Sequence, residues 1–168
     1  MKKRIFALLC AFMLILAACS PRGTDVPPTE QDTDSTEAEA SKQVAVFVPD
    51  AQAEYLTGTY VTVPERESLP EMLIDGLISN GAIPEDVSII EFDDTSATLK
   101  LDLNSAYLTA LGAGGSAGET MTLYSVVNTF LFNYPDASSL ALTVDGKNIE
   151  TEHSSYKNPF TEMQYLRE

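Results

Sequence analysis

The sequence predicts an α+β fold: a two-layer sandwich in which two helices pack on one face of a mixed or antiparallel sheet. Residues 97–103 alternate between apolar and polar side chains, as a strand does when one face lies on a core and the other in water. Residues 69–77 carry apolar side chains at helical spacing. Strand and helix signals alternate in the order β-β-α-β-β-(α)-α-β, which mixes hairpins with helices.

The first predicted elements are two strands and a helix. Residues 44–48 form a continuous apolar run that ends at Pro49-Asp50, as expected of a buried strand, and residues 60–63 form a second strand before a proline. Ser68-Leu69-Pro70-Glu71 has the pattern of a capping box with Pro inside the first turn. The helix that it opens should end at Asn80-Gly81.

A hairpin and a short helix come next. Residues 87–92 and 97–103 flank the polar turn 93–96, so they should pair as antiparallel strands. Residues 104–111 predict a short helix that is ended by the following glycines.

The longest helix should run over residues 117–133 and stop at Tyr134-Pro135. Ser116-Ala117-Gly118-Glu119 precedes it with a second capping-box pattern, in which Ser116 caps the helix and Glu119 reaches back.

The last elements are a hairpin and a tail. Residues 139–144 alternate as a strand, and Asp145-Gly146 is a hairpin signal after which residues 148–150 should return. The tail after Thr151 is polar with a few large apolar residues, and it is expected to lie over the sheet edge.

The first twenty residues indicate export. A basic start, a short apolar run over residues 5–16 and small residues before Cys19 make up a secretory signal peptide, too short to span a bilayer. Its end resembles the lipobox of bacterial lipoproteins. That resemblance implies cleavage after residue 18, diacylglycerol on the Cys19 thiol, and a fatty acyl chain such as palmitate on the new amino terminus. Several acyl chains anchor a protein stably, so the chain should sit on the outer face of a membrane.

We therefore divide the chain into a signal peptide (1–18), a lipidated acidic tether (19–43) and a folded domain (44–168). The tether has one Val against three Pro and six acids, too little apolar surface to fold. Cys10 is discarded with the signal peptide and Cys19 is consumed by lipid, so the domain has no cysteine for a disulfide, a nucleophile or a zinc site.

Charge limits the partners of this protein. The formal net charge is −15, and cleavage after residue 18 removes three basic residues and no acids, which changes it to −18. Such a charge repels phosphate, so nucleic acid is not an expected partner. Basic protein surfaces or cations are compatible with it.

Few residues suggest chemistry. His153, the only histidine, lies in the polar tail and is expected to be solvated. Ser116 follows two glycines, but capping explains it without a nucleophilic role. Glu91 with Asp93-Asp94 could form a weak calcium site or a solvated turn. We favour the solvated turn, because the spacing of an EF-hand is missing. We expect no enzyme activity, no metal and no cofactor. Asn128 lies within an apolar helix, where we expect it to bind a loop backbone, an interface contact being the alternative.

Several segments together resemble the sporulation and spore germination GerM (GerMN) domain. They are Gly115-Ser116-Ala117-Gly118-Glu119, Leu123 to Phe130 with its Val-Asn-Thr, Val144-Asp145-Gly146, and Gly81-Ala82-Ile83-Pro84 upstream. The resemblance covers most of residues 44–150. Phe130-Leu131-Phe132 departs from the usual Leu-Thr-x-Phe, and one copy is present where the sporulation founder has tandem copies.

The resemblance implies a ring-building-motif-like fold and a non-enzymatic role. The expected function is a lipid-anchored interaction module that helps assemble an envelope complex, in sporulation or germination, with envelope or sporulation-complex proteins as partners. A homo-oligomer, through a sheet edge or a helix face, is left open. The alternative is an envelope lipoprotein that binds a cell-wall fragment or a cation in a concave site.

Overall fold

Two sheets and three helices make up the part of the chain described by the computed structural model, residues 41–66 and 68–167. In chain order the elements are β1 (Ser41–Pro49), β2 (Leu56–Pro64), α1 (Leu69–Ser79), β3 (Ile89–Asp93), β4 (Thr98–Leu103), α2 (Ser105–Ala113), α3 (Gly115–Asn133), β5 (Ser139–Val144), β6 (Lys147–Glu150) and β7 (Ser155–Tyr156). No helix in these residues has the length and apolar character needed to cross a membrane.

The larger sheet is mixed, with strand order β3-β4-β5-β6-β7. β4 and β5 run parallel, joined through α2 and α3, and the other neighbours are antiparallel. Leu99, Leu101 and Leu103 of β4 are buried, as the alternation in the sequence predicts. The predicted β3–β4 and β5–β6 hairpins are therefore confirmed.

The β1–β2 hairpin forms a separate two-stranded sheet, with Ser41 opposite Pro64 at one end and Pro49 opposite Leu56 at the other. β1 begins at Ser41, so the predicted end of the tether at residue 43 lies inside this strand. The predicted signal peptide and residues 19–40 of the tether lie outside the described residues.

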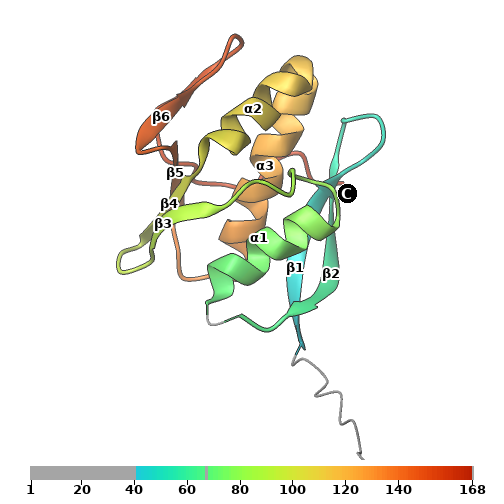
Figure 1. Ribbon diagram of the computed structural model, residues 1–168, viewed down its shortest axis with the longest axis vertical. Coiled ribbons are helices and arrows are strands. Elements are labelled where there is room, and N and C mark those ends of the chain that lie inside the picture. The colour runs from blue at the N-terminus through green and yellow to red at the C-terminus, as the bar shows by residue number, and fades with distance from the viewer. Residues whose placement is uncertain (1–40, 67, 168) are drawn as a thin grey trace, which may run out of the picture. The chain divides into compact units, whose positions relative to one another are not determined.

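The predicted α+β class is confirmed, but the layers differ from the single sheet with two helices that the sequence suggested. In Figure 1 the β1–β2 hairpin lies on one side of α1 and α3, and strands β3 to β5 lie on the other. The physical reason is that the apolar residues of β1 pack against the two helices, and α3 side chains bind its free edge.

Helix α3 occupies the centre of the core. Leu123, Val126, Val127 and Phe130 are fully buried between the sheets and the other helices. Tyr107 of α2 is buried beside it, and its hydroxyl donates to the carbonyl of Thr122 at 3.3 Å. Burial raises the pKa of this phenol, so Tyr107 remains an uncharged donor.

Neither predicted capping box forms. Ser68 occupies the N-cap of α1 in an extended conformation, but its side chain makes no capping hydrogen bond. One of the two usual donors is missing because Pro70 has no N–H. Ser116 lies inside the first turn of α3, because that helix begins at Gly115 rather than at the predicted residue 117.

A glycine sets the distance between α1 and the β1–β2 hairpin. A Cβ atom on Gly76 would lie 2.8 Å from Val46 Cγ1 and 3.2 Å from Val61 Cγ2. Both are branched side chains in a packed core, so they have little freedom to move aside.

We expect Gly76→Ala to lower the free energy of unfolding by about 1–3 kcal/mol, because the added methyl overpacks this contact. Chemical denaturation of both proteins measures the difference. Gly81→Asn is a matched control: its position has open space and a positive φ of 70° that Asn tolerates. Equal stability of Gly76→Ala and wild type would contradict the close packing.

The junction between α2 and α3 depends on two further glycines. Only Gly114 separates the helices, and a Cβ there would lie 2.8 Å from the Cα of Gly118. The glycines after residue 111, which were expected to end the short helix, are therefore mostly helical: Gly112 belongs to α2, and Gly115 and Gly118 belong to α3. The close backbone approach brings the two helices together.

We expect Gly114→Ala to destabilise the fold by about 1–3 kcal/mol, because its methyl meets backbone that cannot rotate away. Gly118→Ala should instead stabilise it by about 0.5–1 kcal/mol, because the position is helical and open. Thermal unfolding of the two variants compares them directly. If both variants change the unfolding temperature in the same direction, the clash at Gly114 is contradicted.

Candidate functional site

The residues singled out from the sequence serve three separate networks rather than one site. Glu119 contacts the β6–β7 segment, Asn128 contacts the C-terminal tail, and Gly146 lies in the β5–β6 turn. Gly115 and Ser116 are exposed at the start of α3. Cys19 lies outside the described residues.

Glu119 is the one acidic residue that is buried within residues 41–66 and 68–167, with 1% of its surface exposed. Its Oε1 accepts hydrogen bonds from the hydroxyls of Thr151 and Tyr156, both at 2.9 Å. The predicted reach back to a helix cap is therefore wrong, because the carboxylate turns towards the β6–β7 segment. Its other oxygen, Oε2, is buried without a hydrogen-bond partner.

The two donors are held in place by their own surroundings. Thr151 Oγ1 accepts the backbone N–H groups of His153 and Ser154, which closes the turn between β6 and β7. Burial and the hydrogen bond to Glu119 raise the pKa of Tyr156, while Ser154 opposes the shift. The Tyr156 phenol therefore keeps its proton at neutral pH and donates to the carboxylate.

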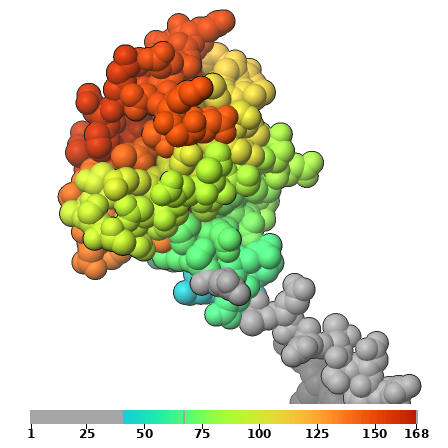
Figure 2. Space-filling view, turned by 60° about the vertical axis from the view of Figure 1, so that its left-hand side comes forward, coloured from blue at the N-terminus to red at the C-terminus, as the bar shows by residue number. Residues whose placement is uncertain are grey.

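An open depression of about 410 Å³ lies over this network. It is lined by Leu108 and Gly112 of α2, by Glu119, and by residues 150–153. Figure 2 shows the orange-red β6–β7 segment beside yellow α2, the region that borders the depression. The depression combines acidic and apolar walls, and one of its lining residues is Glu119, whose Oε2 has no partner.

Asn128 binds the C-terminal tail through both ends of its amide. Nδ2 donates to the carbonyl of Gln164 at 2.8 Å, and Oδ1 accepts the Gln164 N–H at 3.1 Å. The side chain is fully buried, so the expected pairing with a loop backbone is confirmed. The tail also follows the sheet edge, where Phe160 and Leu140 exchange backbone hydrogen bonds at 2.8 Å.

The same helix binds the free edge of β1. Thr129 Oγ1 accepts the N–H of Phe47 at 3.0 Å. Asn133 Nδ2 donates to the carbonyl of Ala45 at 2.8 Å. Backbone groups that would otherwise lie unpaired at the strand edge thus bind side chains of α3.

Gly146 completes the turn between β5 and β6. Asp145 and Gly146 have φ values of 49° and 71°, the left-handed pair of a tight hairpin turn. The Gly146 N–H donates to the carboxylate of Asp102 on β4, at 2.9 Å and 3.0 Å from its two oxygens. The residue therefore has a structural role.

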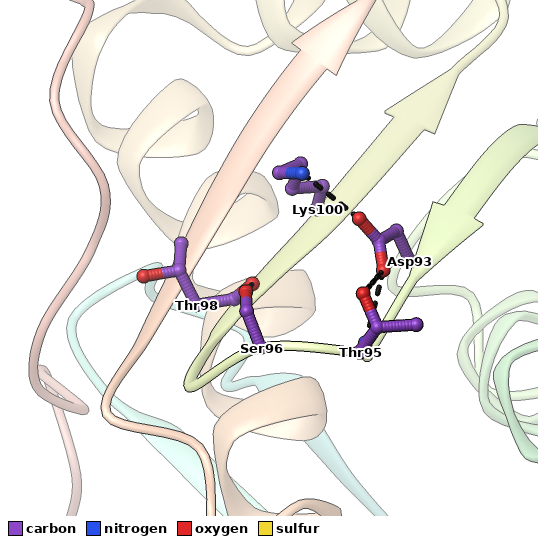
Figure 3. Close-up of polar contacts among 5 residues, drawn as sticks. All are labelled: Asp93, Thr95, Ser96, Thr98 and Lys100. Atoms are coloured by element: carbon purple, nitrogen blue, oxygen red, sulfur yellow. Dashed lines mark hydrogen bonds and ion pairs between the residues drawn. The ribbon is translucent and has the colours of Figure 1, made fainter.

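The acidic turn after β3 is engaged internally (Figure 3). Asp93 Oδ2 accepts from Lys100 Nζ at 2.8 Å, and Oδ1 accepts from the hydroxyl and the N–H of Thr95. The Lys100 ammonium and the Thr95 donors hold the pKa of Asp93 well below its usual range. Within residues 41–66 and 68–167, no three His, Cys, Asp or Glu side chains are grouped to hold a metal ion.

Sequence reasoning missed the partners of these residues. Thr151 and Tyr156 lie more than thirty positions from Glu119, and Asp102 is more than forty positions from Gly146. The one available signal was Glu119 itself: an acid in a helix register that also carries the buried residues Leu123 and Val126.

We expect Asn128→Ala to lower the free energy of unfolding by about 1–3 kcal/mol, because it leaves both backbone groups of Gln164 unpaired. In the variant, the amide hydrogens of residues 160–166 should also exchange faster than in the wild type, by more than those of the sheet do. Chemical denaturation measures the free energy of unfolding, and hydrogen exchange followed by mass spectrometry measures the tail. Unchanged exchange in the tail would mean that Asn128 does not hold it; Thr161→Ala, on the exposed tail surface, is the control.

Comparison with known proteins places the chain in a family. The family model described as "Germane: Sporulation and spore germination" matches residues 29–150. No curated protein matches the chain.

Two solved structures resemble the fold. The tandem GerMN domains of the sporulation protein GerM from Bacillus subtilis superimpose with a TM-score of 0.51 and 17% identity, over 80% of this chain and 49% of that one. A candidate lipoprotein from Clostridium perfringens gives a TM-score of 0.47 and 18% identity, over 73% of this chain and 87% of that one. The present chain thus spans about half the length of the tandem-domain protein.

Proposed function

The chain belongs to the sporulation and spore germination (Germane) family, and from this membership we propose that it is a lipid-anchored interaction module of the cell envelope. In this role it binds other envelope proteins and helps to assemble a complex on the outer face of the membrane, without catalysing a reaction. The observation that carries the proposal is the family match over residues 29–150.

The GerM structure supports the link to sporulation at the level of the fold. That protein is described as a sporulation protein with two GerMN domains, and the described part of the present chain corresponds to about half of it. We propose that this chain contributes a single such domain to a larger assembly and reaches its partners through the membrane anchor.

The anchor is supported by the order of residues at the amino terminus. A basic start, an apolar run and small residues lead directly to Cys19, the residue that a lipoprotein would acylate. The strong negative charge of the chain disfavours electrostatic adhesion to anionic headgroups, so membrane attachment would depend on the lipid.

We expect Cys19→Ser to abolish incorporation of an alkyne-tagged palmitate and to move the protein from the membrane to the soluble fraction, because the thiol that would carry the lipid is removed. Labelling and fractionation of bacteria that express the full chain give both readings. Cys10→Ser is the matched control and should leave both unchanged. Labelling that persists in Cys19→Ser would overturn the anchor.

The assembly role is tested by crosslinking a tagged full-length chain in growing and sporulating cultures, followed by mass spectrometry. We expect enrichment of envelope proteins that disappears when residues 44–168 are deleted and the anchor is kept. Recovery of the bait alone, or an equal set of proteins with the deleted chain, would contradict the assembly role.

A second function, ligand binding, is favoured by one specific observation. The depression beside Glu119 is concave, and this lining residue has a buried acceptor without a partner, which an interaction module does not require.

A further inference from the structure

We propose that the depression between α2 and the β6–β7 segment binds a primary ammonium group carried on an aliphatic stem. Such a group is found on a lysine side chain and on a free alkylamine. The inference rests on the second function proposed above, ligand binding in this depression, and does not depend on the proposed envelope role.

The unpaired oxygen of Glu119 is the first observation. A buried carboxylate oxygen is costly unless it accepts hydrogen bonds or faces a positive charge. Oε1 has two donors, whereas Oε2 has none. None of the ion pairs among the described residues includes Glu119. An external donor would complete the coordination of this carboxylate.

The charge around the depression indicates a cation as that donor. Glu150 and Glu152 line the same depression as Glu119, and the chain as a whole has a formal charge of −15. Lys157, which pairs with Glu150 at 3.2 Å, is a surface partner and not a wall of the depression. The potential at this position should attract a positive group.

The ligand chemistry favours an ammonium over a metal ion. Calcium requires six to eight oxygen ligands, whereas an ammonium needs only a few acceptors. Thr151 Oγ1 already accepts two backbone N–H groups and donates to Glu119, so it is poorly suited to coordinate a metal. No metal-ligand grouping occurs in the described ranges 41–66 and 68–167.

The apolar wall indicates an aliphatic stem. Leu108 is 38% exposed and lines the depression together with Gly112. Methylene groups would pack on Leu108 while the charged end turns towards Glu119, the arrangement that lysine side chains adopt on apolar surfaces.

The shape of the entrance requires a narrow group. Glu119 is only 1% exposed and its Oε2 is buried, so a small head would contact Oε2 only after a slight displacement of the wall, and a bulky head would not fit. A Cβ atom on Gly112 would meet nothing within 4 Å, which means that space is open at this wall. A side chain placed there should obstruct the entrance without contacting Glu119.

The proposal is tested by NMR titration of the full chain in detergent micelles with two probes: N-acetyl-lysine methylamide and n-pentylamine. We expect saturable shifts of the backbone amides of Glu119, Thr151 and His153 with at least one probe. Amide shifts with both probes would mean that the site accepts the side chain of a protein lysine. Amide shifts with n-pentylamine alone would mean that it accepts only free amines. The neutral probe Nα,Nε-diacetyl-lysine methylamide should produce none.

Two variants locate the binding group. Glu119→Gln retains the shape and an acceptor for Thr151 and Tyr156 but removes the charge, so it should weaken binding by about tenfold or more. Glu71→Gln makes the same charge change on the exposed first turn of α1 and should leave binding unchanged.

Gly112→Leu keeps the test decisive if Glu119→Gln does not fold. Leucine favours the helical conformation of this exposed position and should obstruct the entrance, again with a loss of about tenfold or more. Ala113→Leu adds similar bulk on the same helix outside the depression and is its control. Absence of shifts in the wild-type chain, or equal binding by Gly112→Leu, would overturn the proposal.

Discussion

The fold depends on polar side chains that are buried or partly buried along α3. A helix at the centre of an apolar core usually packs through apolar residues alone, but α3 also places Glu119, Asn128, Thr129 and Asn133 against other segments. Asn128, Thr129 and Asn133 bind backbone groups of other segments, and Glu119 accepts from two side-chain hydroxyls. Because an unsatisfied buried polar group is destabilising, these contacts fix which segment lies beside which part of the helix.

This arrangement gives a physical meaning to the Val-Asn-Thr segment that resembles the GerMN family. Asn128 binds the tail and Thr129 binds β1, so adjacent residues of one helical turn hold the first and last segments of the described domain. Val127, the residue before Asn128, is fully buried in the apolar core. The pattern therefore specifies how three segments assemble, which is consistent with a family whose members share a fold at low sequence identity.

The sequence predicted local elements well and long-range contacts poorly. The alternation of β4 and the Asp145-Gly146 turn act between neighbours in the chain, and both were confirmed. Both capping boxes were wrong, because a local pattern does not reveal competing partners: Glu119 binds Thr151 and Tyr156 instead. The separate β1–β2 sheet was missed for the same reason, since the side chains that bind its edge lie more than eighty positions away.

The contacts of α3 with β1 have a mechanical consequence. The chain enters the domain at Ser41, which pairs with Pro64 at the open end of the hairpin. A pull on the preceding segment would therefore act first on these terminal pairs. Further along β1, the next contacts under load are the hydrogen bonds of Asn133 with Ala45 and of Thr129 with Phe47. Through these two hydrogen-bonded contacts, tension on β1 would pass to the long central helix α3.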